Sequence, residues 1–260
     1  MSLKQKIIYK NKNHLSFAEY GNHYGYPILI QHGLIASIDD YDLFDQLIQR
    51  NLRVICIARP GYGESSPYLM NSFAEWADIV SVLISNLGVF RFDVLGISSG
   101  APYSYSLGYR FPDKVGNIYV LSGTPALYDE IVQSNWPYPL IEDRDIAELQ
   151  DLAHELFFSN LSPEDLKKND IRDSMMYNGF GVAQDLRLRF MKWGFALSDV
   201  KTPVYMRHSK TDDAVPFTTA IRTAELLSNS QLELVETGPH FSKEVLDDFI
   251  ETTIVENMDS

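Results

Sequence analysis

Cysteine and basic residues are scarce in this sequence. Cys56 is the only cysteine among 260 residues, so no disulfide can form within the chain. Lysine and arginine number 22 against 35 aspartates and glutamates, which gives a formal net charge of −13. Such a surface repels phosphate backbones and anionic lipid headgroups. We therefore expect neither nucleic acid nor a membrane as a partner.

Long apolar runs are also missing. No stretch approaches the roughly 20 apolar residues that span a bilayer, and no apolar signal-peptide core follows the charged residues at the start. We therefore expect a cytoplasmic protein. The sequence gives no indication of an oligomeric state.

Metal and cofactor signals are missing as well. No group of His, Cys, Asp and Glu has metal-ligand spacing, and no glycine loop is of the P-loop or dinucleotide-binding type. We expect no metal and no cofactor.

What the sequence does contain is an alternation of strand and helix patterns. A hairpin is predicted first, from Ile7–Tyr9 and His14–Tyr20. Apolar runs typical of strands buried on both faces then recur at 27–31, 52–58, 92–97, 115–121, 204–207 and 232–235. Helical spacing separates most of them, and Ser72 with Glu75 predicts a capping box at the start of one helix. This alternation predicts an α/β fold, with a mostly parallel central sheet and helices on both faces.

The alternation stops after residue 125. From about 127 to 199 the sequence has helical periodicity, no strand pattern and many large apolar residues. We predict an inserted helical cap at 126–199 on a core formed by 1–125 and 200–260. Most of its aromatic side chains should pack inside the cap, and a few should line a substrate pocket, since such pockets are largely apolar.

The segment Phe92–Ala101 places Gly-x-Ser-x-Gly between a strand pattern and a helix pattern. A serine on so sharp a turn has strained backbone geometry and an exposed hydroxyl, and the flanking glycines avoid collisions. The N–H groups at the start of the helix point toward the serine, where an oxyanion would form. The pattern predicts a nucleophile elbow at Ser98.

A serine hydroxyl needs a base to remove its proton, and a carboxylate to orient that base. Asp212 follows the predicted strand at 204–207, and His240 follows the one at 232–235. Each lies in a loop at the carboxyl end of a late strand, and the order serine, aspartate, histidine suits a hydrolase of this fold.

Four motifs in this order resemble those of the α/β-hydrolase superfamily, and the likeness covers essentially the whole chain. They are His32-Gly33-Leu34-Ile35, similar to the His-Gly-x-Pro oxyanion loop; Arg59-Pro60-Gly61-Tyr62-Gly63-Glu64-Ser65, similar to the Arg-x-Gly-x-Gly-x-Ser turn; the elbow Gly96-Ile97-Ser98-Ser99-Gly100; and Asp212-x-x-Val215-Pro216 with Gly238-Pro239-His240-Phe241.

The resemblance implies that Ser98 is the nucleophile, Asp212 the orienting acid and His240 the base. Asp213 is the alternative acid, although the Asp-x-x-Val-Pro spacing favours its neighbour. Some members of the superfamily place the acid after the preceding strand, which makes Asp129 a further alternative.

The resemblance also implies an oxyanion hole formed by the backbone N–H groups of Leu34 and Ser99. The residues that support these motifs are His32, Gly33, Gly96 and Gly100. The sequence departs from the family pattern at Ile35, where proline is usual, at Ala58, where aspartate is common, and at Ser209, which replaces a common glycine. None of these departures removes a catalytic group.

The expected function is therefore that of a serine hydrolase of carboxylesterase type (EC 3.1.1). It would cleave a small-molecule ester, or a thioester, lactone or small amide, through an acyl-enzyme. An alternative is a hydrolase-like small-molecule receptor with slow or no turnover. Further alternatives are a cofactor-free perhydrolase, a carbon–carbon bond hydrolase, and an aminopeptidase whose Glu142 or Asp143 would hold a free amine.

Overall fold

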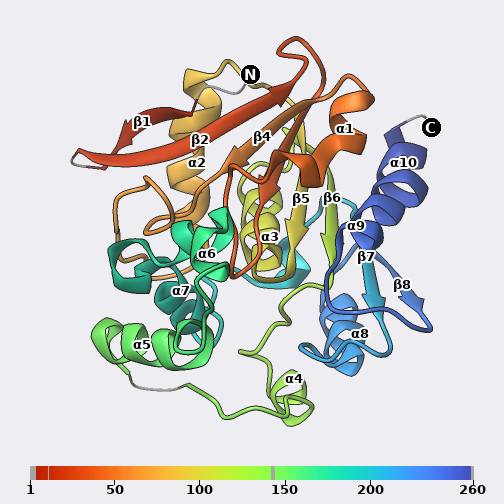
Figure 1. The fold of residues 1–260 in the computed structure, drawn as a ribbon. Helices are drawn as coiled ribbons and strands as arrows, with labels where there is room; N and C mark the ends of the chain where they lie inside the picture. The colour runs from red at the N-terminus through yellow and green to blue at the C-terminus, as the bar shows by residue number, and fades with distance from the viewer. Residues whose placement is uncertain (1–3, 11, 142–143, 259–260) are drawn as a thin grey trace.

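The computed structural model describes residues 4–10, 12–141 and 144–258. Its centre is an eight-stranded sheet with the order β1-β2-β4-β3-β5-β6-β7-β8 (Figure 1). Only β2 runs antiparallel to its neighbours, and all other pairs are parallel. The strands are β1 Gln5–Tyr9, β2 Asn13–Gly21, β3 Pro27–Gln31, β4 Arg53–Ile57, β5 Phe92–Ile97, β6 Val115–Leu121, β7 Val204–Ser209 and β8 Ser230–Val235. The mostly parallel sheet and the hairpin at its edge are both confirmed.

Alternate residues of the central strands pack into two separate apolar clusters. On β3, Leu29 belongs to one cluster, which includes side chains of α2 (Ala74–Asn86) and α3 (Ala101–Arg110). Its neighbours Ile28 and Ile30 belong to the other cluster, with side chains of α1 (Asp45–Gln49) and α9 (Lys243–Phe249). A sheet buried on both faces explains why these strands are continuous apolar runs.

Further helical elements lie outside residues 126–199 in the part of the chain that the structure describes. They are the 3-10 turns η1 Tyr41–Phe44 and η2 Ser98–Gly100, the helix α8 Phe217–Leu226, the π-helical turn η6 Ile250–Val255 and α10 Glu256–Met258.

The capping box predicted at Ser72 is wrong. Phe73 precedes α2 and makes no capping side-chain hydrogen bond. Glu75 instead pairs with Lys10 of the hairpin at 2.5 Å and accepts hydrogen bonds from Tyr68 Oη and Asn71 N–H. The Glu75 carboxylate, which a capping box would use at the start of α2, instead forms an ion pair with a residue distant in the sequence.

Between β6 and β7, the part of the chain that the structure describes forms helices and no strand. These are α4 Glu130–Ser134, α5 Ile146–Ala153, the π-helical turn η3 His154–Phe158, η4 Asp165–Lys167, α6 Asn169–Ser174, α7 Met176–Leu188 and η5 Leu197–Asp199. Figure 1 shows α5, α6 and α7 grouped beyond the ends toward which the parallel strands point.

Candidate active site

Ser98 lies at the junction of β5 and α3 with φ of 50°, in the left-handed region that side chains rarely adopt. The two elbow glycines are required for space. A Cβ on Gly100 would lie 1.9 Å from Gln31 O, and one on Gly96 would lie 2.4 Å from Ser104 Oγ. The strand and helix can approach this closely only without those side chains.

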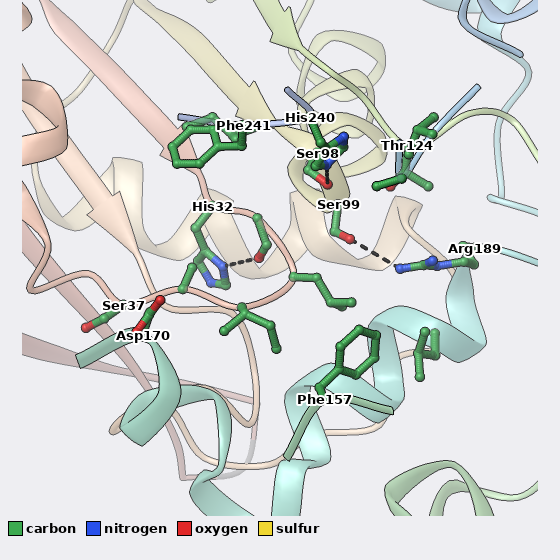
Figure 2. A pocket seen from close by; sticks show the side chains of 18 of the residues that line it. His32, Ser37, Ser98, Ser99, Thr124, Phe157, Asp170, Arg189, His240 and Phe241 are labelled. Carbon is green, nitrogen blue, oxygen red and sulfur yellow. Dashed lines mark hydrogen bonds between the residues drawn. The ribbon is translucent and has the colours of Figure 1, made fainter. Parts of the chain in front are cut away.

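A chain of hydrogen bonds links Ser98 to two residues from distant loops. His240 Nε2 lies 2.8 Å from Ser98 Oγ (Figure 2). His240 Nδ1 lies 2.8 Å from Asp212 Oδ2. Since a carboxylate only accepts, Nδ1 carries the proton in this pairing, and Nε2 is free to accept one from the serine. The structure therefore brings together the three side chains that the sequence predicted as nucleophile, base and acid.

The Asp212 side chain is fully inaccessible to solvent. Its Oδ1 accepts hydrogen bonds from the N–H groups of Ala214 (2.9 Å) and Val215 (2.8 Å), and His208 Nε2 lies 3.1 Å from its Oδ2. Burial by itself raises the pKa of Asp212, but hydrogen bonds from His208, His240 and the Val215 N–H outweigh it and hold the pKa well below its usual value. The carboxylate stays ionised.

The two alternative acids lie in other settings. Asp213 is exposed. Asp129 caps α4 by accepting from the N–H groups of Ile131 and Val132, and it also pairs with Arg222 at 3.4 Å. Asp212 is the acid that contacts His240.

Side-chain hydrogen bonds to its backbone carbonyl groups hold the loop after β3 in place. Arg59 Nη1 donates to His32 O (2.5 Å) and Nη2 to Gly33 O (2.9 Å), while Tyr62 Oη donates to Leu34 O (2.8 Å). In a planar trans peptide the C=O and the following N–H point in opposite directions. Holding Gly33 O toward Arg59 therefore turns the Leu34 N–H to the other side of the loop.

His32 makes structural hydrogen bonds rather than facing the serine. Its Nδ1 lies 2.8 Å from Gly33 O, and its Nε2 accepts from the Arg59 N–H at 3.3 Å. Burial lowers the pKa of His32 well below its usual value, and the charge of Arg59 lowers it further, although the bond to Gly33 opposes both. The ring is neutral and fixed in one tautomer.

A cavity of about 1130 Å³ opens beside Ser98 and His240. Its wall is largely apolar, with Leu34 and Ile35 from the loop after β3 and Trp136, Tyr138 and Phe157 from the helical segment before β7. These are three of the aromatic residues that the sequence left unassigned, whereas Phe158 and Trp193 are buried in the apolar clusters.

The sequence profile of the alpha/beta hydrolase fold family matches residues 26–245. The chain belongs to the alpha/beta hydrolase fold family. Among solved structures, an esterase from Exiguobacterium antarcticum superposes with a TM-score of 0.76 at 18% identity, over 99% of this chain and 100% of the esterase.

The relatives found by sequence include two hydrolases. A 2-hydroxy-6-oxononadienedioate/2-hydroxy-6-oxononatrienedioate hydrolase of Escherichia coli K12 is 24% identical over 218 residues, which cover 76% of this chain and 74% of that protein. The uncharacterized hydrolase YcgS of Bacillus subtilis is 28% identical over 98 residues, and this match spans only 34% of its length.

Within this alpha/beta hydrolase fold, His208 is a site residue that sequence reasoning missed. Its ring is buried, and Nε2 lies 2.8 Å from Val215 O as well as 3.1 Å from Asp212 Oδ2. Both partners are acceptors, so Nε2 carries a proton and donates. The available signal was its position in a strand, four residues before Asp212.

Ser209, which departs from the family pattern, ties the acid loop to the histidine loop. Its Oγ donates to Gly238 O (2.8 Å), and Thr211 Oγ1 also reaches Gly238 O (3.1 Å) and accepts from Gly238 N (3.0 Å). These bonds fix Asp212 relative to His240.

Asp185 and Arg189 were also missed, because the helical segment carries no motif for either. Asp185 lies in α7 and pairs with Arg59 at 2.5 Å. Arg189 follows the end of α7, lines the cavity and donates through Nη2 to Ser99 Oγ at 3.3 Å (Figure 2).

The two candidate amine-binding residues, Glu142 and Asp143, lie outside the described residues. Within the described ranges, no group of three or more His, Cys, Asp and Glu side chains could hold a metal ion. No helix there is both long enough and apolar enough to cross a membrane.

Proposed function

We propose that this protein is a serine hydrolase that cleaves small-molecule esters through an acyl-enzyme. The observation that carries the proposal is the hydrogen-bond chain from Ser98 Oγ through His240 to Asp212, at the wall of a large apolar cavity. Ser98 is the nucleophile, His240 the general base and Asp212 the acid that orients His240 and stabilises its charged form.

Each half-reaction uses the same groups. His240 Nε2 removes the Ser98 proton as the oxygen attacks the carbonyl carbon, and the resulting imidazolium is balanced by Asp212. His240 then protonates the leaving alcohol as the C–O bond breaks. In deacylation His240 activates a water molecule, which attacks the acyl-enzyme, and the proton returns to Ser98.

The negative oxygen of each tetrahedral intermediate rests on the N–H groups of Leu34 and Ser99. Support for this oxyanion hole comes from the carbonyl contacts of Arg59, which fix the peptide plane that carries the Leu34 N–H. Ser99 is in the first turn leading into α3, where the helix dipole also favours negative charge. Both donors are preorganised by the backbone.

Residues 126–199 act as a cap over a core formed by 1–125 and 200–260. Support comes from the cavity wall, to which both parts contribute: Trp136 and Phe157 on one side, Leu34 and Ser98 on the other. The apolar wall favours a hydrophobic acyl or alcohol group in the substrate.

A second candidate is hydrolysis of a carbon–carbon bond beside a ketone, with the same three side chains. The observation that favours it is the relative from E. coli, whose named substrate is a keto diacid without an ester group. The two candidates differ in the bond that breaks, so a substrate panel separates them.

The test is hydrolysis of p-nitrophenyl acetate and butyrate by the wild-type protein and by Ser98→Ala. Repeated turnover that falls by about 10⁴-fold or more in the variant supports the esterase. Labelling of Ser98 by a fluorophosphonate without turnover of these esters favours the small-molecule receptor. Turnover of a vinylogous 1,5-diketo acid in preference to both esters favours carbon–carbon hydrolysis. Equal rates in both proteins would refute the role of Ser98.

A further inference from the structure

Arg189 introduces a positive charge into the cavity beside the nucleophile. Its guanidinium lines the same cavity as Ser98 and His240 and reaches Ser99, the residue that follows Ser98, at 3.3 Å. Figure 2 shows this side chain extending from the end of α7 toward the two serines. The surrounding wall, including Leu186 and Phe190, is largely apolar.

No carboxylate of the described residues lies within salt-bridge distance of Arg189. Its Nε is buried and has no hydrogen-bond partner there. Arg189 as a whole is partly buried, but a buried N–H group without a partner is costly, because it has lost its hydrogen bonds to water. The Arg189 guanidinium has one serine hydroxyl as its hydrogen-bond partner and one buried N–H without a partner. It therefore has room for a further acceptor.

Asp185, whose charge acts on Arg189, cannot complete this site. Asp185, one helical turn earlier, accepts from Arg59 and Tyr62 at Oδ2 and from Tyr103 at Oδ1. Asp185 is therefore paired with Arg59, which leaves the Arg189 guanidinium without an ion-pair partner among the described residues. Burial lowers the pKa of Arg189, although the charge of Asp185 opposes this, and arginine stays protonated throughout the working range of pH.

We propose that Arg189 is the binding site for a carboxylate group of the substrate, on the part of the molecule near the reacting carbonyl. The planar fork of a guanidinium matches a carboxylate and can bind it through two parallel hydrogen bonds. The lining also carries charged side chains of both signs, namely Asp40, Asp42, Asp170, Arg144, Lys167 and Lys168, but Arg189 is the one that reaches the residue next to Ser98. A single guanidinium without a carboxylate partner suits a single negative charge better than a phosphate dianion. The inference depends on the hydrolase proposed above, since it specifies which substrates that site prefers.

The test compares ester pairs of equal chain length. The p-nitrophenyl half-esters of glutaric and adipic acid carry a carboxylate where p-nitrophenyl pentanoate and hexanoate end in a methyl group. The quantity measured is the ratio of kcat/KM for the charged ester to that for its neutral partner, after subtraction of the uncatalysed rate. The variants are Arg189→Gln and Arg189→Lys.

Wild type should prefer at least one charged ester, and Arg189→Gln should lower the ratio by about 30-fold or more, since desolvated charge pairs contribute strongly. Arg189→Lys keeps the charge without the fork and should retain part of the preference. The matched control is Arg187→Gln, two residues earlier, whose guanidinium donates to Met70 O and does not line the cavity. Its ratio should equal that of wild type.

A second measurement does not depend on turnover. Glutarate should raise the melting temperature of wild type and of Arg187→Gln more than that of Arg189→Gln, at ionic strength matched with sodium chloride. If no ester is hydrolysed but this difference is present, the proposed function fails and the carboxylate site stands. A preference ratio unchanged by Arg189→Gln, or equal glutarate shifts in all three proteins, would overturn the site.

Discussion

Arg59 and Asp185 form an ion pair of 2.5 Å in the interior, and each side chain is at most 2% exposed. The pair joins the turn after β4 to helix α7, two segments 126 residues apart in the sequence. Because Arg59 also holds the carbonyl groups of His32 and Gly33, the same contact links the helical segment to the loop beside Ser98.

Asp185→Asn should destabilise the protein strongly. Removal of one partner leaves the Arg59 charge buried without compensation, which costs about 3–5 kcal/mol. The measurement is the free energy of unfolding in urea. The matched control is Asp78→Asn, which breaks a 3.4 Å pair with Arg110 whose side chains are 54% and 57% exposed. Exposed pairs contribute about 0–1 kcal/mol, so equal losses in both variants would contradict this view of the interior pair.

His208 should matter for catalysis through Asp212. His208→Ala removes a buried donor to a charged acceptor, a bond worth about 1.5–3 kcal/mol, and should lower kcat by about 10- to 100-fold. His208→Gln supplies an amide N–H in its place and should restore part of the rate. Unchanged kcat in His208→Ala, with the protein folded by circular dichroism, would mean that Asp212 needs no such support.

The choice between two adjacent acids can be tested directly. Asp212→Asn replaces an acceptor of the His240 Nδ1 proton with a group that can also donate, and this favours the wrong tautomer of the ring. The expected loss in kcat is about 10⁴-fold. Asp213→Asn changes an exposed side chain and should leave kcat within about twofold of wild type. A large loss of kcat in Asp213→Asn alone would mean that Asp213, and not Asp212, is the catalytic acid.

His32 should make stability depend on pH. Its pKa in the folded protein lies below the ordinary value of about 6.5 that it has when unfolded. The unfolded state therefore binds a proton that the folded state does not, so the stabilisation is fully present above pH 6.5 and is lost as the pH falls. Between pH 7.5 and 5.5, wild type should lose about 1 kcal/mol more than His32→Asn in urea unfolding. Parallel losses in the two proteins would show that His32 does not titrate in this way.

The sequence predicted the elements whose pattern is local. Strands such as Pro27–Gln31 and Val115–Leu121 are apolar runs flanked by turn residues, and the structure has them at those bounds. The elbow glycines and the order of Ser98, Asp212 and His240 along the chain can likewise be identified from the sequence alone.

What the sequence could not give are contacts between segments that are distant along the chain. Glu75 looked like half of a capping box, but its carboxylate pairs with Lys10 of the hairpin. Arg189 is one of several charged residues near the end of a helical pattern, and only the folded chain brings it to Ser99. The spacing of residues in the sequence predicts neither of these two contacts.

The central claim is that turnover passes through Ser98. The most direct measurement is a titration with a fluorophosphonate, in which the fraction of Ser98 modified, read by mass spectrometry of the peptide, is plotted against the remaining p-nitrophenyl butyrate hydrolysis. We predict a straight line that reaches zero activity at one label per chain, with the label on Ser98. Hydrolysis that persists after Ser98 is fully modified would contradict the account.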